Sequence, residues 1–276
     1  MNPSVEDISI LTAVTPSYLP YLAVQLLSAC ESAAQTTRLN YTILHLGIEK
    51  RNQKKITDLI GFRHKVSWHF IEPEFLKRVG APAWFNGCDP HFFRLLAPYA
   101  CPDLERVIYL DADTLIIDDL ARLWRERLDG YAAGAVRDLF PTFREAIEHL
   151  HELNLPAETP YFNTGVLLIN LELWRRVGLV AKVLKHVKCH PKGISAPTQG
   201  GFLQWDQYGV NVAMANCCKE LPTHWNFFSR RPALSDAPFI VHFVGDAKPG
   251  TLRCQKRFSA LFFDILLRTP WSGWQF

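Results

Sequence analysis

The sequence lacks a strong excess of charge of either sign. Its 30 basic and 27 acidic residues give a formal net charge of +3 for 276 residues. Domains that bind nucleic acid usually carry a marked basic patch, so this balance argues against a nucleic-acid partner. Hydrophobic residues make up 48% and charged residues 21%, which is typical of a globular protein with a large core.

Long hydrophobic runs are also absent. No run reaches the roughly 18 apolar residues that a membrane-spanning helix needs. The N-terminal stretch MNPSVEDIS has no basic segment of the kind that begins a signal peptide. We therefore expect a cytoplasmic protein, with peripheral contact to the inner face of a membrane as an option.

The cysteines lack the spacing of a disulfide framework or a zinc ribbon. Seven are present, an odd number, and no pair is spaced C-x-x-C. Buried, reduced thiols in a cytosolic protein are the simpler interpretation.

The hydrophobic pattern predicts strands and helices in alternation. Residues 8–14, 41–46 and 66–71 are expected to be strands, and 18–34 and 50–60 to be helices. This β-α-β-α-β order predicts an α/β fold with a mostly parallel sheet. Further on we expect helices at 92–99, 120–128 and 171–187, strands at 106–119, 132–136, 166–169 and 239–244, and a flexible loop at 190–201. No internal repeat or linker divides the chain, so one compact domain is expected.

The stretch RVIYLDADTLIIDD, residues 106–119, places two carboxylates after a buried strand. In an extended backbone, side chains at positions i and i+2 point the same way, so Asp111 and Asp113 should converge. Two carboxylates that close repel each other, and a divalent cation such as Mg²⁺ or Mn²⁺ relieves the repulsion. The alternative is a pair of solvated aspartates in a turn.

Phosphatases of the haloacid dehalogenase type also place D-x-D after an apolar strand. Their pattern requires Thr or Val two residues after the second Asp, where this chain has Leu115. That mismatch argues against a phosphatase.

Three more segments accompany the D-x-D in order: YFNTGVLLINLELWRR, QWDQYGVN and VHFVGDAKPG. Together with YLDAD, they resemble glycosyltransferase family 8 over about residues 8–250. That family includes bacterial lipopolysaccharide galactosyl- and glucosyltransferases and the glycogenins. The resemblance implies a GT-A fold, which is a Rossmann-like α/β domain with a mostly parallel central sheet flanked by helices. We expect a single GT-A domain over residues 1–276, with 251–276 as its basic, aromatic tail.

The resemblance also implies a reaction. The family moves a sugar, here expected to be galactose or glucose, from a UDP-sugar to a carbohydrate or lipid-linked acceptor with retention of anomeric configuration. Asp111 and Asp113 match its metal-binding D-x-D, and His242 matches its third ligand. Mn²⁺ is the expected metal, with Mg²⁺ as an alternative. Lys248 matches a lysine that contacts the donor phosphates. The alternatives are purely structural roles: a hydrogen-bonded core histidine for His242, and a surface turn for Gly245 and Lys248.

Other residues match donor-binding or catalytic positions. Asp138 would bind sugar hydroxyls, Asp206 would contact the sugar, and Gln207 would lie near the anomeric carbon. Because a neutral amide is a poor nucleophile, we expect attack from the leaving-group side. Capping and turn roles are the alternatives, together with a surface-helix role for Arg94. The remaining donor-binding candidates are Ala13, Thr15, Tyr18, Arg94, Ala112, Asn163 and Gly245.

The chain departs from the family pattern at two places. Thr15 and Ser17 stand where acidic and asparagine residues often contact the nucleoside, and Gly250 stands where tryptophan often follows K-P. These changes leave base selectivity open, and they keep a non-catalytic nucleotide-sugar-binding relative as an alternative. Acceptor pockets are expected in 81–90, 140–160 and 190–201. The tail could lie on a membrane surface or pack as a terminal helix on the domain.

Overall fold

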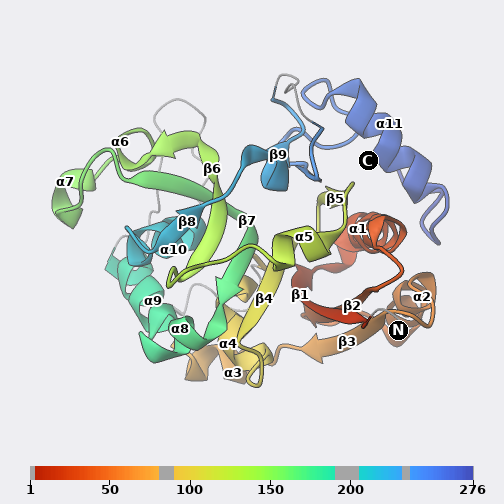
Figure 1. The fold of residues 1–276 in the computed structure, drawn as a ribbon, viewed down its shortest axis with the longest axis horizontal. Coiled ribbons are helices and arrows are strands. Elements are labelled where there is room, and N and C mark those ends of the chain that lie inside the picture. The colour runs from red at the N-terminus through yellow and green to blue at the C-terminus, as the bar shows by residue number, and fades with distance from the viewer. Residues whose placement is uncertain (1–3, 81–89, 190–204, 232–236, 276) are drawn as a thin grey trace. The chain divides into compact units, whose positions relative to one another are not determined.

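The computed structural model describes residues 4–80, 90–189, 205–231 and 237–275 (Figure 1). The chain forms two compact units. Unit 1 comprises Met1–Ile71, Val107–Arg127 and Pro222–Phe276, and unit 2 comprises Glu72–Arg106 and Leu128–Leu221. The chain therefore enters unit 2 twice, and each unit is assembled from segments that are distant in sequence.

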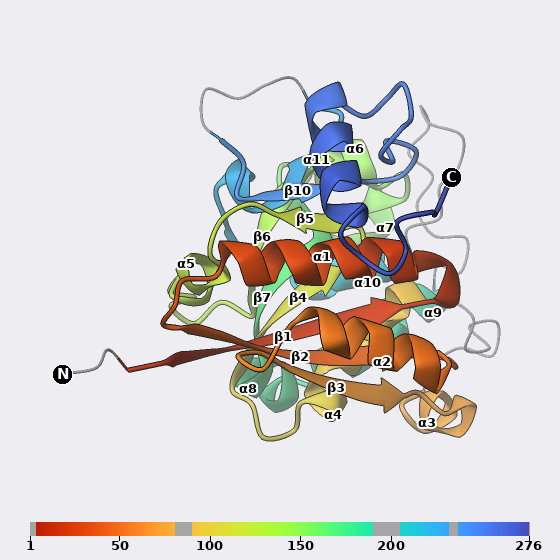
Figure 2. The ribbon, with the colours of Figure 1, turned by 90° about the vertical axis from the view of Figure 1, so that its right-hand side faces the viewer.

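Four strands of unit 1 pair in parallel, in the order β3-β2-β1-β4. Figure 2 shows the helices α1 and α2 beside the strands that they connect. The expected β-α-β-α-β start and its parallel pairing are confirmed, although β2 begins earlier than predicted. The elements are β1 (Glu6–Val14), α1 (Leu19–Ser32), β2 (Thr37–His45), α2 (Lys50–Leu59), β3 (Lys65–Phe70) and β4 (Arg106–Asp111).

A second, smaller sheet also belongs to unit 1. Its order is β5-β10-β9, with β10 (Ile240–His242) antiparallel to β5 (Thr114–Ile116) and parallel to β9 (Phe227–Phe228). The prediction of one strand over 106–119 is therefore wrong. A turn at Ala112 and Asp113 ends β4, and the chain continues as β5 in the other sheet.

The C-terminal helix α11 (Lys256–Leu266) packs on unit 1. Phe258 and Phe262 are buried with Tyr21 and Phe243 in one hydrophobic cluster. The Phe262 ring lies 5.3 Å from the Tyr21 ring and 5.4 Å from the Phe243 ring, measured between centroids. The interpretation of the tail as a packed terminal helix is confirmed. The other elements of this unit are η1 (Pro16–Tyr18), α5 (Leu120–Trp124) and η4 (Thr223–Asn226).

Unit 2 contains three strands in the order β7-β6-β8. β6 (Ala133–Thr142) is antiparallel to β7 (Pro160–Asn170) and parallel to β8 (Cys218–Glu220). Most of the described strand pairs of the two units are thus parallel, as predicted. The helices are η3 (Pro90–Leu96), α3 (Pro73–Arg78), α4 (Ala97–Ala100), α6 (Phe143–Ala146), α7 (Leu150–Leu153), α8 (Leu171–Arg176), α9 (Leu179–Cys189) and α10 (Trp205–Ala213).

Two helices of unit 2 differ from their predictions. The segment 92–99 is mainly a 3₁₀ helix, η3, followed by the short α4. The predicted helix 171–187 is divided into α8 and α9 at Gly178, whose φ of 60° is left-handed. Glycine adopts this conformation at low cost, and it commonly ends a helix.

A pronounced bulge interrupts β7 next to its polar residues. In the pairing with β6, Ala135 faces Leu167 but Val136 faces Asn163. Thr164, Gly165 and Val166 therefore face no residue of β6 in the regular pairing. The predicted strand 166–169 is consequently too short, because β7 extends on both sides of the bulge.

Other expectations concern cysteines, loops and membrane spans. All six cysteines in the described ranges are free, in agreement with reduced thiols. The expected loop 190–201 and most of the acceptor segment 81–90 lie outside the described residues. Where the chain is described, no helix combines the length and apolar character needed to cross a membrane.

Candidate functional site

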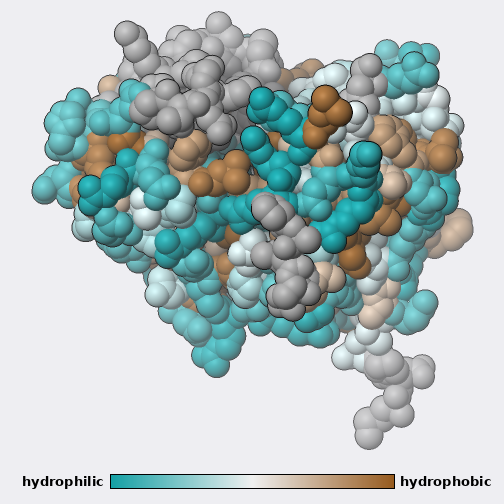
Figure 3. Space-filling model, turned by 90° about the horizontal axis from the view of Figure 1, so that it is seen from above, coloured by the Kyte–Doolittle hydropathy of each residue, from teal (hydrophilic) through white to brown (hydrophobic). Residues whose placement is uncertain are grey.

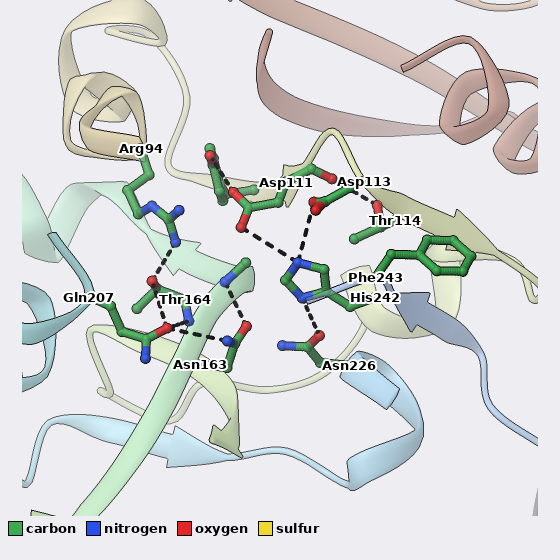
Figure 4. Close-up of polar contacts among 12 residues, drawn as sticks. Arg94, Asp111, Asp113, Thr114, Asn163, Thr164, Gln207, Asn226, His242 and Phe243 are labelled. Atoms are coloured by element: carbon green, nitrogen blue, oxygen red, sulfur yellow. Dashed lines mark hydrogen bonds and ion pairs between the residues drawn. The ribbon is translucent and has the colours of Figure 1, made fainter. Parts of the chain in front are cut away.

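The D-x-D carboxylates and His242 form a compact cluster in unit 1. One potential ligand atom from each of Asp111, Asp113 and His242 lies within 4.8 Å of the other two. His242 Nε2 is 3.4 Å from an oxygen of Asp113 and 3.7 Å from an oxygen of Asp111. Figure 4 shows the imidazole facing both carboxylates. Two oxygen ligands and one nitrogen ligand at this spacing suit a divalent cation such as Mn²⁺.

The carboxylates converge because of the turn between β4 and β5. Gln25 on α1 is fully buried, and its side-chain amide donates to the Asp111 carbonyl at 2.6 Å and to the Thr114 hydroxyl at 2.7 Å. The Thr114 hydroxyl also donates to the Asp111 carbonyl at 3.0 Å. At the other side, the Phe243 N–H donates to the Asp113 carbonyl at 3.0 Å. These contacts hold the turn from two directions.

Asp113 is buried with two basic partners. The Lys248 ammonium forms an ion pair with it and also donates to the Phe243 carbonyl at 2.7 Å. Burial by itself would raise the pKa of the Asp113 carboxyl, but Lys248 and His242 outweigh burial and hold that pKa well below its usual range. Burial would likewise lower the pKa of Lys248, and the Asp113 charge raises it instead. The cluster therefore contains an ionised carboxylate and a protonated ammonium.

Two tyrosines flank Lys248. Its ammonium lies 5.5 Å from the centre of the Tyr18 ring and 5.7 Å from that of the Tyr21 ring, within the range of cation–π attraction. The two rings stack on each other at 5.1 Å. Burial raises the pKa of the Tyr18 phenol, which therefore stays protonated.

The first loop lies at the end of β1. Ala13 pairs with Asp111 in the parallel register, so the end of β1 lies beside the end of β4. The hydroxyls of Thr15 and Ser17, the two residues that depart from the family pattern, hydrogen-bond each other at 3.0 Å. Ala112 is buried in the D-x-D turn.

The segment after β10 carries two glycines with left-handed backbone. Gly245 has φ of 58° and Gly250 has φ of 86°. An added Cβ at Gly245 would meet no atom within 4 Å, so backbone conformation rather than space requires glycine there. The Ser229 hydroxyl donates to the Ala247 carbonyl at 2.8 Å, which ties this segment to the end of β9. The surface-turn description of this segment is therefore correct for its backbone, while its Lys248 side chain points to Asp113.

Gln207 is the centre of a buried polar network in unit 2. Its side-chain oxygen accepts from the Thr164 N–H at 3.1 Å and from the Asn163 amide at 3.2 Å. Its side-chain nitrogen donates to Asp138 at 3.2 Å. Thr164 lies in the β7 bulge, where it faces no residue of β6, and its N–H bonds Gln207 instead. Figure 4 shows Gln207 turned toward Thr164 and Asn163.

Asp138 accepts hydrogen bonds from several donors. One oxygen accepts from the Leu139 N–H at 2.7 Å, and the other accepts from the Asn163 amide at 3.0 Å. Asn163 also accepts from the Gly165 N–H at 3.0 Å. The turn-residue alternatives are thus correct in part, because both side chains bind local backbone and also join the network around Gln207.

Arg94 and Asp206 form a buried ion pair in the same unit. Arg94 Nε is 3.0 Å from Asp206, and the Arg94 guanidinium also donates to the Thr164 hydroxyl. Arg94 is only 2% exposed, so its assignment as a surface-helix arginine is wrong. Asp206 and Gln207 lie at the start of α10.

The predicted residues thus form two groups, each within one unit. Asp111, Asp113, His242 and Lys248 are together in unit 1, and Asp138, Asn163, Gln207, Arg94 and Asp206 are together in unit 2. Sequence reasoning did not find Gln25 or Asn226, although each bonds directly to a candidate residue. Buried amides and hydroxyls are common in cores, so their sequence context had no distinguishing signal.

Similarity to known proteins supports the expected fold. Over 97% of this chain and 96% of its own length, general stress protein A of Bacillus subtilis is 23% identical. Lipopolysaccharide 1,2-glucosyltransferase of Escherichia coli is 25% identical over 53% of this chain and 44% of its own length. The crystal structure of the galactosyltransferase LgtC, in complex with donor and acceptor sugar analogues, matches with a TM-score of 0.75 at 23% identity and covers 96% of both chains. The expected GT-A fold is thereby confirmed.

The family model gives the most direct assignment. The model for glycosyl transferase family 8 matches residues 9–250, which include both groups of candidate residues. The chain therefore belongs to glycosyltransferase family 8.

Proposed function

We propose that this protein is a metal-dependent, retaining hexosyltransferase. It moves galactose or glucose from a UDP-sugar to a carbohydrate or glycolipid acceptor. The observation that carries the proposal is the buried cluster of Asp111, Asp113 and His242 with Lys248 beside it. A protein that only bound a nucleotide sugar would not need this ligand set together with a buried ammonium.

The ligand set supports Mn²⁺ as the bound metal. An imidazole nitrogen with two carboxylates favours Mn²⁺ over Mg²⁺, which prefers oxygen ligands alone. When bound, the metal would supply positive charge that neutralises the donor diphosphate.

Lys248 supplies positive charge from the chain itself. Its ammonium is protonated and largely shielded from water, with 19% of the side chain exposed. We assign it to the diphosphate, where it would donate to an oxygen that gains charge as UDP departs. Fixed charges are most effective when they are held in place before the reaction begins.

The network around Gln207 supports attack from the leaving-group side. The Gln207 side-chain oxygen already accepts from the Asn163 amide and from the N–H and hydroxyl of Thr164, and a neutral amide is a weak nucleophile. In the proposed step, the acceptor oxygen bonds to the anomeric carbon as the bond from that carbon to the phosphate oxygen breaks. The acceptor proton passes to an oxygen of the departing phosphate. Asp138, Asn163 and Asp206 would hold the hydroxyls of the sugar. A covalent sugar trapped on Asp138 or Asp206 would contradict this mechanism.

A glycolipid acceptor would bring the protein to a membrane. The name of the Escherichia coli relative supports a lipopolysaccharide-type acceptor. Leu261 and Leu267 on the C-terminal segment are 45% and 67% exposed, and Arg257 and Lys256 are nearby in sequence. Figure 3 shows that the face seen from above is mostly hydrophilic outside the grey residues, with hydrophobic side chains in separate groups. Because the two exposed leucines of the tail lie near basic residues, we propose peripheral membrane contact through the tail, with the protein otherwise in the cytoplasm.

Removing the tail would not test this contact, because Phe258 and Phe262 belong to the core. The better variant is Leu261→Ser with Leu267→Ser, which changes only exposed side chains. Sedimentation with anionic liposomes should fall for this variant and stay unchanged for a control with Phe62→Ser, an exposed residue on the loop after α2. Equal sedimentation of all three proteins would remove the membrane contact from the proposal.

The function is tested by UDP release from a panel of UDP-sugars with and without Mn²⁺. Wild type should release UDP from one sugar, and either chelator or Asp113→Asn should abolish the release. Tight UDP binding without release from any sugar would favour the non-catalytic relative. The product of the active donor with a simple acceptor, analysed by NMR, would show whether configuration is retained.

A further inference from the structure

Asn226 is a buried amide in direct contact with the candidate ligand His242. The His242 Nδ1 and the Asn226 side-chain oxygen are 3.0 Å apart. Asn226 is 0% exposed and His242 is 4% exposed, so water cannot easily replace either partner (Figure 4).

The position of Asn226 follows from the small sheet. Asn226 ends η4 and directly precedes β9, and β9 pairs in parallel with β10 so that Phe228 lies beside His242. The Phe228 ring also packs against the imidazole at 6.2 Å between centroids, nearly at right angles. The ring of His242 is thus held by one polar and one apolar contact from the same short segment.

This contact determines what the other ring nitrogen can do. An amide oxygen accepts a hydrogen bond, so Nδ1 must carry the proton when it bonds Asn226. In a neutral imidazole, Nε2 then carries the lone pair, and Nε2 is the atom that faces Asp111 and Asp113. A proton on Nε2 would instead be donated toward Asp113, and the nitrogen could not bind a metal. Asp113 and Asn226 therefore favour opposite tautomers of the same ring.

We propose that Asn226 is a positioning residue that fixes the tautomer and orientation of His242, so that Nε2 is available as a metal ligand. The inference rests on the metal site of the proposed function and adds a residue that none of the sequence motifs contains. Partners of this kind raise metal affinity because the free energy of orienting the ring is supplied before the metal arrives.

The test compares two substitutions of similar size. Asn226→Leu removes the acceptor, whereas Asn226→Asp keeps an acceptor oxygen for Nδ1–H. Binding of Mn²⁺ alone is measured by the electron paramagnetic resonance signal of the free ion, which needs no turnover. Asn226→Leu should weaken Mn²⁺ binding about 10- to 100-fold. Asn226→Asp should bind within a few-fold of wild type.

A matched control separates positioning from general destabilisation. Gln53 is another buried amide of unit 1, and its side chain donates to the Ile48 carbonyl at 2.8 Å, with no part in the metal cluster. Gln53→Leu should lower the melting temperature and leave Mn²⁺ affinity unchanged. In activity assays, Asn226→Leu should raise the Mn²⁺ concentration for half-maximal rate more than it lowers the rate at saturating Mn²⁺.

The outcomes distinguish this inference from the function on which it rests. Wild-type Mn²⁺ affinity in a folded Asn226→Leu would overturn the role of Asn226 and leave the metal site intact. An equal loss in the Asp and Leu variants would overturn the role of the acceptor oxygen. Absence of Mn²⁺ binding by wild type would overturn both the inference and the metal dependence of the proposed function.

Discussion

At the scale of single residues, the site depends on a few buried polar atoms whose partners come from other parts of the chain. The sequence analysis predicts that the D-x-D carboxylates converge because side chains alternate along one strand. In the structure, a turn rather than a strand brings them together. They converge because Gln25 and Thr114 bind the Asp111 carbonyl and the Phe243 N–H binds the Asp113 carbonyl. The chemistry of the site was therefore readable from its residue types, while its geometry was not.

Lys248 is the residue whose loss should affect the reaction most directly. Lys248→Met should reduce the rate of UDP release about 100- to 1000-fold, the usual cost of removing one donor to a developing negative charge. Lys248→Arg keeps the charge with a different shape and should lose less. Steady-state rates at saturating Mn²⁺ measure the effect. Wild-type rates in Lys248→Met would contradict the assignment of this ammonium to the leaving group.

Gln25 should affect the site through the turn that it holds. Gln25→Met has a similar size but cannot donate to the Asp111 carbonyl or the Thr114 hydroxyl. We expect a loss of about 1–3 kcal/mol in the free energy of unfolding, because the turn loses both buried hydrogen bonds that Gln25 donates. Mn²⁺ binding should weaken as well. Urea denaturation and Mn²⁺ titration of this variant beside Gln53→Met would separate the two effects.

At the scale of elements, pH should act on unit 1 through the contact between β2 and the residue that precedes β3. His64 is buried, and its Nδ1 accepts from the Leu39 N–H at 3.0 Å. Burial, with the nearby Arg63 charge, lowers the pKa of His64 to about 4. The unfolded chain, with a histidine pKa of about 6.5, therefore binds a proton at a higher pH than the folded protein does.

The stability contributed by neutral His64 is thus present above about pH 6.5 and is lost as pH falls toward 4. After allowance for solvent screening, we expect the loss from this residue to be about 1 kcal/mol between pH 7 and pH 5. His64→Asn offers an amide oxygen to the Leu39 N–H and does not titrate in this range. Denaturant midpoints of both proteins at the two pH values test the idea. An equal pH dependence in the two proteins would exclude His64 as its source.

The helix α11 should stabilise unit 1 through one face. Phe262 is 1% exposed and contacts Tyr21 and Phe243. Phe262→Ala should cost about 3–5 kcal/mol, the usual effect of removing a buried aromatic side chain. Leu261→Ala on the same helix changes a residue that is 45% exposed and should cost about 0.5 kcal/mol or less. Similar melting temperatures for the two variants would contradict the packing of α11.

At the scale of the whole molecule, the proposed single GT-A domain has a simple test. Each unit is assembled from separate segments, so the chain crosses between them several times. We propose that residues 1–276 unfold in one cooperative transition. Hydrogen exchange resolved by mass spectrometry in increasing urea should show β1 and β7 losing protection at the same midpoint. Two well-separated midpoints would instead indicate two domains.

Most of the fold was predictable from the sequence, because strands and helices depend on local periodicity. The starts of β1, α1 and α2 agree with their predictions to within two residues. The errors arose where tertiary contacts replace regular hydrogen bonds. One is the turn after Asp111, where side chains hold the backbone. Another is the bulge at Thr164, where Gln207 accepts a backbone N–H.

The sequence by itself determined the family, the order of the elements and the chemical types at the site, because these depend on neighbouring residues. Only the tertiary structure decided how those groups are oriented. Asn226 and His242 are 16 residues apart, Gln25 and Asp111 are 86 apart, and Lys248 and Asp113 are 135 apart. Contacts over such separations leave no local pattern, since any buried amide or ammonium can be satisfied by many partners. Which partner it meets depends on how the strands pair and where the helices pack.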